Sequence, residues 1–186
     1  MSFDVDLFHL INATWSNIAF DTFFPWWTNV QRTAEFKFFF LPLILIGTFY
    51  FVRWRGLLTL AVASLTAWAA DTFCSTLIKP LFLRPRPYDA GLPFEVFVRI
   101  TRAHGTSFPS SHALTSTCLA TFCAIQFPRL KWVFAVMAFL IVYSRVYNGV
   151  HYPTDVLAGA ALGFIFGWAS SLAYDRLLRK YLKGTP

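Results

Sequence analysis

Long apolar segments dominate this sequence and restrict what it can fold into. A helix needs about 20 mostly apolar residues to cross a bilayer. Segments that meet or approach this length follow one another from residue 36 onward. Their expected bounds are Phe36–Val52, Leu57–Ile78, His112–Phe127, Trp132–Tyr147 and Pro153–Leu172. The sequence therefore predicts an all-α integral membrane protein, built as a bundle of five transmembrane helices.

Composition agrees with this class and argues against others. The chain is 56% hydrophobic with a mean hydropathy of +0.53, which is too apolar for an ordinary soluble domain. Its 186 residues suit a single domain over 1–186. The net charge of +7 does not indicate nucleic-acid binding, because the charges fall at the ends of apolar segments. Cys74, Cys118 and Cys123 lie inside apolar stretches and are expected to be buried small hydrophobic residues.

The first 30 residues have a different pattern from the rest of the chain. Apolar residues recur there at helical spacing, but His9, Asn12, Asn17 and Asp21 interrupt them. This pattern predicts an amphipathic helix that lies in the membrane interface as an N-terminal segment over 1–30. A sixth span in this region is the alternative, although its polar residues are costly at the bilayer centre.

The distribution of basic residues predicts the orientation of the chain. The links at 53–56 and 128–131 and the C-terminal segment are short and basic, and five spans place them on one side of the membrane. The positive-inside rule assigns that side, with the C-terminus, to the cytoplasm of a bacterial inner membrane. The long link over 79–111 and the segment 144–155 then face outward, towards the periplasm.

Three small residues form a stripe on the last expected helix. Gly159, Gly163 and Gly167 are spaced four residues apart, which lets another helix approach closely. Packing within this chain is the expected use, and a homo-oligomer through the same face is the alternative.

Ionisable residues gather at the outward ends of the spans, in three clusters. The clusters are Lys79, Arg84 and Arg86; Ser110, Ser111 and His112; and Arg145, His151 and Asp155. Because successive spans alternate in direction, all three clusters fall on the same side of the membrane. A pocket with several cations favours a phosphate dianion, and the planar fork of arginine fits phosphate oxygens. The same cations oppose a divalent metal, so no metal or other cofactor is expected.

The histidines suggest a division of roles. Pro153 suits the first position of a helix, so Asp155 lies in its first turn and can reach back to His151. A carboxylate that holds one ring nitrogen raises the reactivity of the other. His112 has no carboxylate close to it in sequence. His151 is therefore the expected nucleophile and His112 the expected proton donor to the leaving oxygen. Asp71, inside the second span, is expected to support the bundle or Lys79.

The three clusters resemble the signature of the type 2 phosphatidic acid phosphatase superfamily, K-x6-R-P, P-S-G-H and S-R-x5-H-x3-D. Lys79 with Arg86 matches the first part, and the segment from Ser144 to Asp155 matches the third at full spacing. The second part departs at Ser111, where the family has glycine. The resemblance implies that His151 is transiently phosphorylated, that His112 protonates the leaving group and that Asp155 orients His151. It also implies the phosphate-binding residues Lys79, Arg86, Ser110, Ser111 and Arg145.

The resemblance implies a metal-independent membrane lipid phosphatase, acting on a phosphate monoester or diphosphate. The expected substrates are lipid A 1-phosphate, undecaprenyl diphosphate, phosphatidylglycerophosphate and phosphatidic acid, because the chain resembles bacterial enzymes of this branch. A lipid phosphotransferase that uses the same phosphohistidine is one alternative. A non-catalytic transporter that binds anions is the other. The link at Phe94–Ile100 is expected to cover the lipid headgroup.

Overall fold

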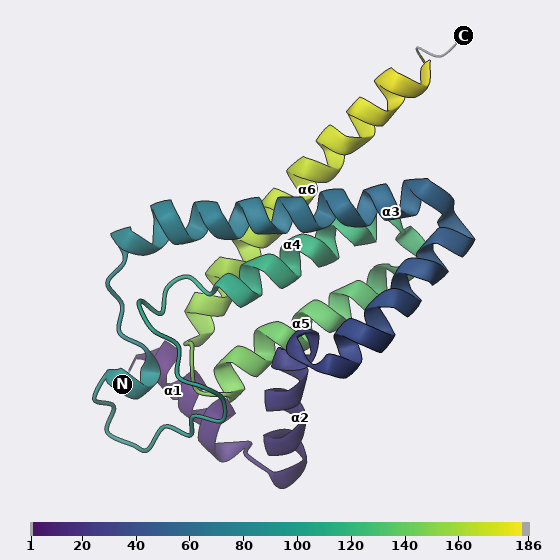
Figure 1. Cartoon of the computed structure of the whole chain (residues 1–186). Helices are drawn as coiled ribbons and strands as arrows, with labels where there is room; N and C mark the ends of the chain where they lie inside the picture. The colour runs from purple at the N-terminus through teal and green to yellow at the C-terminus, as the bar shows by residue number, and fades with distance from the viewer. Residues whose placement is uncertain (1, 184–186) are drawn as a thin grey trace.

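The computed structural model describes residues 2–183, and within them the protein is helical with no β-strand. Its α-helices are α1 (Phe3–His9), α2 (Ile18–Asn29), α3 (Leu41–Phe73), α4 (Ser111–Gln126), α5 (Lys131–Tyr147) and α6 (Pro153–Lys183). Figure 1 shows α3 to α6 as a bundle with α1, α2 and the 82–110 loop gathered at one end. The all-helical prediction is confirmed. The last residues of the basic C-terminal segment, 184–186, lie outside the described part of the chain.

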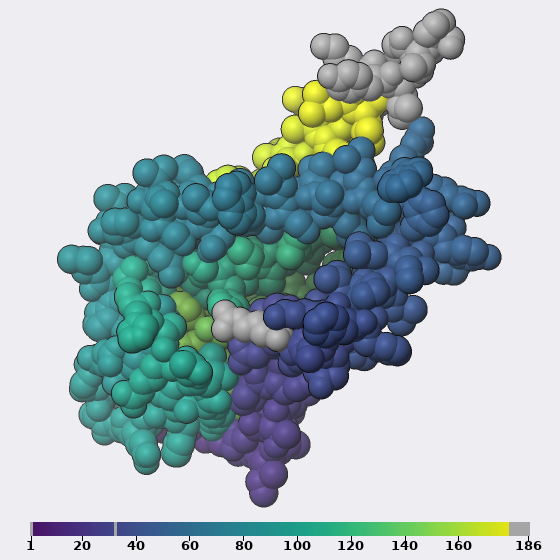
Figure 2. Space-filling model, viewed as in Figure 1, coloured from purple at the N-terminus to yellow at the C-terminus, as the bar shows by residue number. Residues whose placement is uncertain are grey.

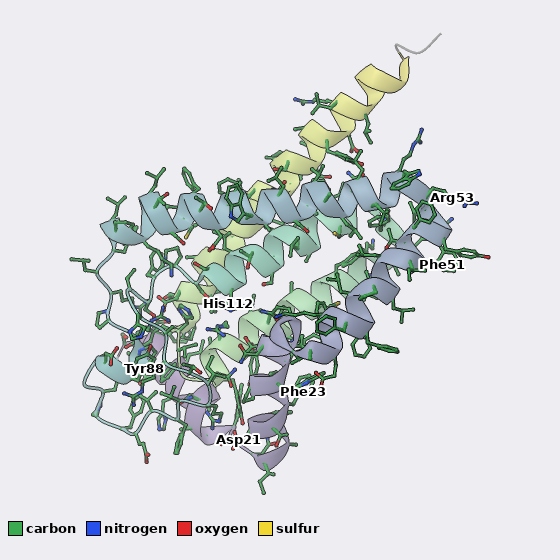
Figure 3. All side chains as sticks on the ribbon, viewed as in Figure 1. Asp21, Phe23, Phe51, Arg53, Tyr88 and His112 are labelled. Carbon is green, nitrogen blue, oxygen red and sulfur yellow. The ribbon has the colours of Figure 1, made fainter. Side chains whose placement is uncertain are left out.

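The first two expected spans form one bent helical region, Phe36–Leu81, with π-helical turns at Phe36–Phe40 and Cys74–Ile78. The bend lies at Arg53, whose φ of 62° is uncommon for a residue with a side chain. The chain reverses direction there, and the two limbs diverge from the bend in a V (Figures 1 and 3). Gly56 makes the sharp return feasible, since a Cβ at this position would lie 2.6 Å from the Cγ2 atom of Thr48.

Three helical regions of the described chain are long and apolar enough to cross a membrane: Phe36–Leu81, Pro128–Tyr147 and Pro153–Leu178. The remaining expected span appears as α4, whose 16 residues make it shorter than the others. Large apolar side chains of the spans point outward, among them Trp68, Phe139 and Phe164. Outward-facing apolar residues on every side suit a lipid environment rather than water.

Helix α4 is the centre of the bundle and contacts α3, α5 and α6. The glycine stripe of α6 lies directly against it. A Cβ at Gly163 or Gly167 would overlap a backbone carbonyl of α4, that of Leu114 or Cys118, and one at Gly159 would overlap the carbonyl of Ser110, just before this helix. The stripe is therefore used inside the chain, and a contact between two copies through it would have to displace α4. Cys74, Cys118 and Cys123 are buried and free, as expected.

The N-terminal segment forms two helices rather than one. Helix α1 continues into a π-helical turn at Leu10–Thr14, and α2 begins after Asn17, whose side chain accepts a hydrogen bond from the Phe20 amide at 3.0 Å. Helix α2 packs against α5, and α1 contacts the start of α6. Neither helix is among the described regions long enough to cross a membrane. The N-terminal helices and the loop together cover one end of the bundle (Figure 2).

Candidate active site

The structure brings the three ionisable clusters to one end of the bundle. The end of α3, the start of α4, the end of α5 and the start of α6 all lie there, beside α1 and the loop (Figure 1). The Ser110 amide donates a hydrogen bond to the Asp155 carbonyl at 3.0 Å, which fixes the start of α4 to the first turn of α6. His112 follows directly, in the first turn of α4 (Figure 3).

His151 lies at the centre of this region and is only 3% exposed. Its Nδ1 atom is 2.8 Å from the Ser107 carbonyl oxygen and 3.6 Å from Asp155 Oδ2. A carbonyl oxygen can only accept, so Nδ1 carries the ring proton. The other nitrogen, Nε2, lies 3.3 Å from Nη1 of Arg86, which can only donate. The ring is therefore the tautomer whose Nε2 lone pair faces the cationic side of the site.

The environment also keeps the ring uncharged at neutral pH. Burial lowers the pKa of His151 to about 4. The nearby carboxylate of Asp155 opposes this shift, whereas the charges of Arg145 and Arg86 reinforce it. A neutral imidazole with an available lone pair is the form that a nucleophile requires.

Asp155 is fully buried, and several donors hold its two oxygens. Oδ2 accepts hydrogen bonds from the Ser107 hydroxyl at 2.5 Å and from the Tyr152 amide at 2.8 Å. The second bond also caps the first turn of α6, which explains why the helix begins here. Oδ1 accepts from Nη1 of Arg84 at 2.6 Å. Asp155 thus lies beside His151, while the Ser107 carbonyl is the nearer acceptor of the ring proton.

Arg86 uses its donors to hold the surrounding backbone. Its Nε donates to the Gly105 carbonyl at 3.1 Å and its Nη1 to the Val150 carbonyl at 3.0 Å. Further bonds to carbonyls of His104 and Thr106 are longer, at 3.5 and 3.3 Å. Burial lowers the pKa of Arg86. The guanidinium therefore ties the end of the long loop to the turn that carries His151.

The other two expected cations lie nearby. Arg145 is only 4% exposed, and its Nη1 donates to the hydroxyl of Thr28 in α2 at 2.9 Å. Its charge is close enough to act on His151. Lys79 stands at the end of the bent helical region, within electrostatic range of Arg86 and of Asp155. Asp71 also acts electrostatically on Lys79, but its Oδ1 is buried with no hydrogen-bond partner among the described residues, and its supporting role stays a prediction.

The second cluster begins α4. Ser110 precedes the helix, and its hydroxyl oxygen is buried with no hydrogen-bond partner among the described residues. Ser111 is the first helical residue and is not among the residues with a positive φ. The serine in place of the family's glycine therefore causes no backbone strain. It keeps the N–H group that the first turn of a helix offers to an anion.

Sequence patterns do not identify three residues that support the site: Asp4, Thr28 and Ser107. Arg84 belongs to the first cluster by sequence, but it lies outside the positions of the family signature. Ser107 precedes the second cluster by only three residues, and this short distance in sequence indicates that it lies near the site. Asp4 and Thr28 belong to the N-terminal helices and carry no local pattern that links them to His151.

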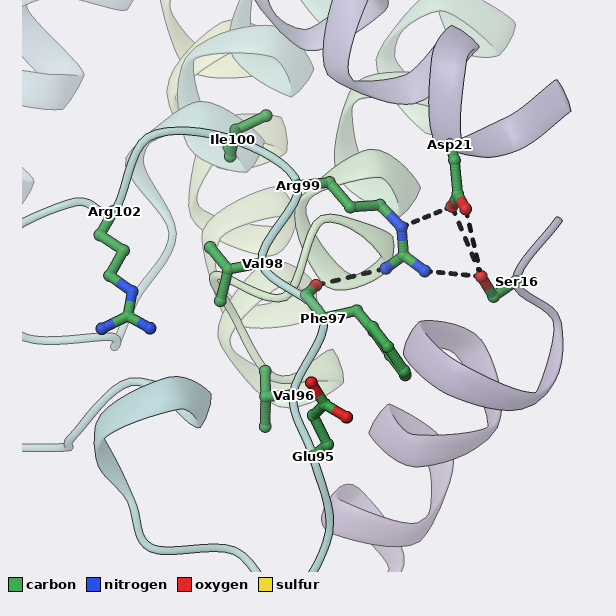
Figure 4. Close-up of a pocket in the computed structure, with 9 residues that line it drawn as sticks. All are labelled: Ser16, Asp21, Glu95, Val96, Phe97, Val98, Arg99, Ile100 and Arg102. Atoms are coloured by element: carbon green, nitrogen blue, oxygen red, sulfur yellow. Dashed lines mark hydrogen bonds and ion pairs between the residues drawn. The ribbon is translucent and has the colours of Figure 1, made fainter. Parts of the chain in front are cut away.

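The expected headgroup link lines a surface groove of about 590 Å³ with Ser16 and Asp21. Figure 4 shows the guanidinium of Arg99 reaching from the loop to Asp21 and Ser16. Its guanidinium contacts Asp21 Oδ1 at 2.5 Å, the Ser16 hydroxyl at 2.7 Å and the Tyr147 carbonyl at 2.8 Å. Arg99 therefore fastens the long loop to α2 and to the end of α5.

Known proteins are similar to this chain in sequence and in fold. Residues 58–179, which include all three clusters, match the PAP2 superfamily. Lipid A 4′-phosphatase of Bacteroides thetaiotaomicron is 34% identical, with 87% of this chain and 76% of that protein covered. Phosphatidylglycerophosphatase B of Bacillus subtilis is 36% identical, with 76% and 72% covered. The crystal structure of Aquifex aeolicus LpxE superposes with a TM-score of 0.69 at 29% identity, over 91% of this chain and 95% of that one. The chain therefore belongs to the PAP2 superfamily, among its membrane lipid phosphatases.

Proposed function

We propose that this protein hydrolyses a phosphate from a membrane lipid through a phosphohistidine at His151. The observation that carries the proposal is the state of that ring. Its Nδ1 proton is held by a backbone carbonyl, and its Nε2 lies 3.3 Å from Nη1 of Arg86. Burial lowers its pKa to about 4, and the charges of Arg145 and Arg86 reinforce that shift. Such a ring is neutral, oriented and next to the charges that attract a phosphate.

The reaction follows from the groups around the ring. Nε2 attacks phosphorus with its lone pair while the bond from phosphorus to the lipid oxygen breaks. His112, at the start of α4, gives a proton to the departing oxygen. Water then attacks phosphorus while giving a proton to His112, the bond from Nε2 to phosphorus breaks, and inorganic phosphate leaves with both imidazoles back in their starting states. Lys79, Arg86, Ser110, Ser111 and Arg145 are the proposed phosphate-binding residues. They would stabilise the charge on the transferred group, an effect that is often the largest part of catalysis.

A second feature supports a lipid as the substrate. An apolar groove of about 610 Å³ lies between α4, α5 and α6. Its lining begins close to the phosphate site on each helix. Thr117 is five residues after His112, Val142 is three before Arg145, and Leu157 is two after Asp155.

From Leu157 the groove follows α6 to Trp168, 11 residues on, or about 16 Å at a rise of 1.5 Å per residue. This is about half of the ~30 Å hydrocarbon core, the depth of one leaflet. A lipid with its phosphate at His151 can therefore place one apolar chain in the groove.

The candidate substrates are lipid A phosphates, undecaprenyl diphosphate, phosphatidylglycerophosphate and phosphatidic acid. The names of the relatives in B. thetaiotaomicron and B. subtilis favour lipid A and phosphatidylglycerophosphate among them. We further propose that the site faces the periplasm of a bacterial inner membrane, with the C-terminus in the cytoplasm. The basic links at 53–56 and 128–131 support this orientation.

Phosphate release from purified protein tests the proposal. The panel contains the four lipid classes, with and without a chelator, and no lipid acceptor. Wild-type protein is expected to release phosphate from at least one lipid with the chelator present, and His151→Ala is expected to lose nearly all release while still folding. Retained release by His151→Ala would exclude His151 as the nucleophile. Loss of release in the chelator would exclude the metal-independent mechanism.

The same experiment separates the alternatives. A phosphotransferase would release little phosphate until a lipid with a free hydroxyl is added. An anion transporter would release none, and its anion flux would survive His151→Ala.

A further inference from the structure

The N-terminal helix α1 reaches the carboxylate beside the proposed nucleophile through a single arginine. Arg84 donates from Nη1 to Asp155 Oδ1 at 2.6 Å and from Nη2 to Asp4 Oδ2 at 2.5 Å. The two carboxylates are 151 residues apart in sequence. One guanidinium therefore links the first turn of α1 to the first turn of α6.

The three side chains of this link are largely shielded from solvent. The side chain of Asp155 is 0% exposed, that of Asp4 13% and that of Arg84 30%. The guanidinium also lies 4.0 Å from the ring centre of Tyr152. Burial lowers the pKa of Arg84, but Asp4 and Asp155 outweigh burial and raise it above its usual value. Arg84 is thus a permanent cation neutralised by two acids, unlike the arginines that face the phosphate site.

Asp4 has further contacts that set its position. Its Oδ1 accepts from the Thr154 amide at 2.9 Å, and its Oδ2 accepts from the Thr154 hydroxyl at 2.7 Å. The carboxylate therefore binds the N–H group and the hydroxyl of Thr154 at the start of α6, where a negative charge is favourable. Asp4 is fixed relative to the helix that carries Asp155, and so it fixes Arg84 as well.

The consequence for the nucleophile passes through Asp155 and Ser107. With Oδ1 held by Arg84, Oδ2 is left to bind the Ser107 hydroxyl, and the carbonyl of the same serine holds the ring proton of His151. Without Asp4, Nη1 of Arg84 would keep Asp155 and the Thr154 hydroxyl, at 2.6 and 2.7 Å, but Nη2 would lose its carboxylate and the guanidinium one of its two neutralising charges. It could then pull Asp155 away from Ser107 or compete for the phosphate.

We propose that Asp4 and Arg84 are positioning residues that hold Asp155, and through Ser107 the ring of His151, in the orientation needed for attack. The inference deepens the proposed function and depends on it. Helix α1 would then help to position the reacting ring, in addition to packing over the end of the bundle.

The test compares phosphate release by Asp4→Asn, Arg84→Gln and the double variant, with Asp6→Asn as the matched control. Asp6 lies on the same helix and is exposed, so the control makes the same change in charge. Asparagine keeps the shape of Asp4 and an oxygen for Thr154, so α1 stays in place. Thermal unfolding of each purified variant checks this.

We expect Asp4→Asn to lower kcat about 10-fold with KM changed less than about threefold, and Asp6→Asn to match wild type. Because Asp4 acts through Arg84, the double variant is expected to be no slower than Arg84→Gln alone. A purely structural tie would instead lower the unfolding temperature and leave kcat unchanged. Wild-type kcat in Asp4→Asn, or losses that multiply in the double variant, would overturn the inference.

The experiments distinguish failure of this positioning role from failure of the proposed function. If His151→Ala still releases phosphate, the proposed nucleophile is wrong whatever Asp4 does. If His151→Ala is inactive and Asp4→Asn has wild-type kcat, the proposed function stands and only the positioning role fails.

Discussion

The Ser107 carbonyl oxygen accepts the Nδ1 proton of His151 at 2.8 Å, and this contact fixes which ring nitrogen is available for attack. The hydroxyl of the same serine donates to Asp155 at 2.5 Å. One residue therefore holds both the imidazole and its neighbouring carboxylate. His151, the proposed nucleophile, is oriented by the backbone of the long loop as well as by the acid in α6.

Replacement of Ser107 separates these two contacts. Ser107→Ala removes the hydroxyl and keeps the carbonyl, so the tautomer of His151 is preserved while Asp155 loses one donor. We expect kcat to fall about 10-fold and folding stability to drop by about 1–3 kcal/mol, because a buried acceptor loses a partner. Phosphate release and thermal unfolding measure the two effects. Ser116→Ala, in the middle of α4, is the control and is expected to retain kcat; an unchanged kcat in Ser107→Ala would contradict the arrangement.

The protein is expected to stay active at lower pH than an enzyme whose histidine nucleophile has an ordinary pKa. The pKa of His151 is lowered to about 4 from 6.5, so the ring stays neutral as the pH falls through 6. We expect log(kcat/KM), which reports the free enzyme, to decline on its acidic side only at about pH 5 and below. Arg145→Gln removes one cation that lowers this pKa, so its acidic limb is expected to move to higher pH. A wild-type limb centred near 6.5 would exclude a buried, neutral His151.

The same shift has a consequence for stability. In the unfolded chain His151 has its ordinary pKa of 6.5, whereas in the folded chain its pKa is about 4. Between these two pH values the unfolded chain therefore binds a proton at His151 and the folded chain does not. Folding stability should therefore be lost as the pH falls through this window, and this contribution should be constant above it. His151→Gln has no such group, so its unfolding temperature is expected to depend less on pH between 6.5 and 4.

The glycine stripe provides a stability prediction with an internal control. Gly163→Ala places a Cβ against the Leu114 carbonyl of the central helix, and we expect it to separate α6 from α4 and to destabilise the protein by more than about 1 kcal/mol. Gly47→Ala adds the same methyl group where nothing lies within 4 Å. It is expected to be neutral or stabilising, because alanine is the better helix former. Equal unfolding temperatures for the two variants would contradict the close packing of α6 on α4.

Local sequence patterns predicted those parts of the site that are set by local geometry. Pro153 and Asp155 begin a helix by rules that act within one turn, so the closeness of His151 and Asp155 could be anticipated. The alternation of spans placed the three clusters on one side. The pairing of Arg84 with Asp4 could not be anticipated, because it depends on how a short N-terminal helix packs against α6. The break at Arg53 was expected only as a link between spans; its backbone geometry has no signal in residue type.

The apolar groove between α4, α5 and α6 yields a prediction about chain length in the substrate. Ala160 lines this groove, and Ala160→Phe would fill part of it. The bilayer is as apolar as the groove, so the groove contributes mainly by placing the phosphate correctly over His151. A displacement of about 1 Å can cost up to about 100-fold in rate. We expect kcat/KM for a long-chain phospholipid phosphate to fall at least about 10-fold.

A short-chain, water-soluble phosphate ester serves as the comparison, since it does not need the groove, and its kcat/KM in Ala160→Phe is expected to stay within about twofold of wild type. Ala69→Phe adds the same ring at an exposed position of α3 outside the groove, and should affect neither substrate. Equal losses on both substrates would indicate that the ring disturbs the site itself. No loss on either would show that the lipid chain lies elsewhere. A loss confined to the long-chain substrate would place its apolar chain against α6.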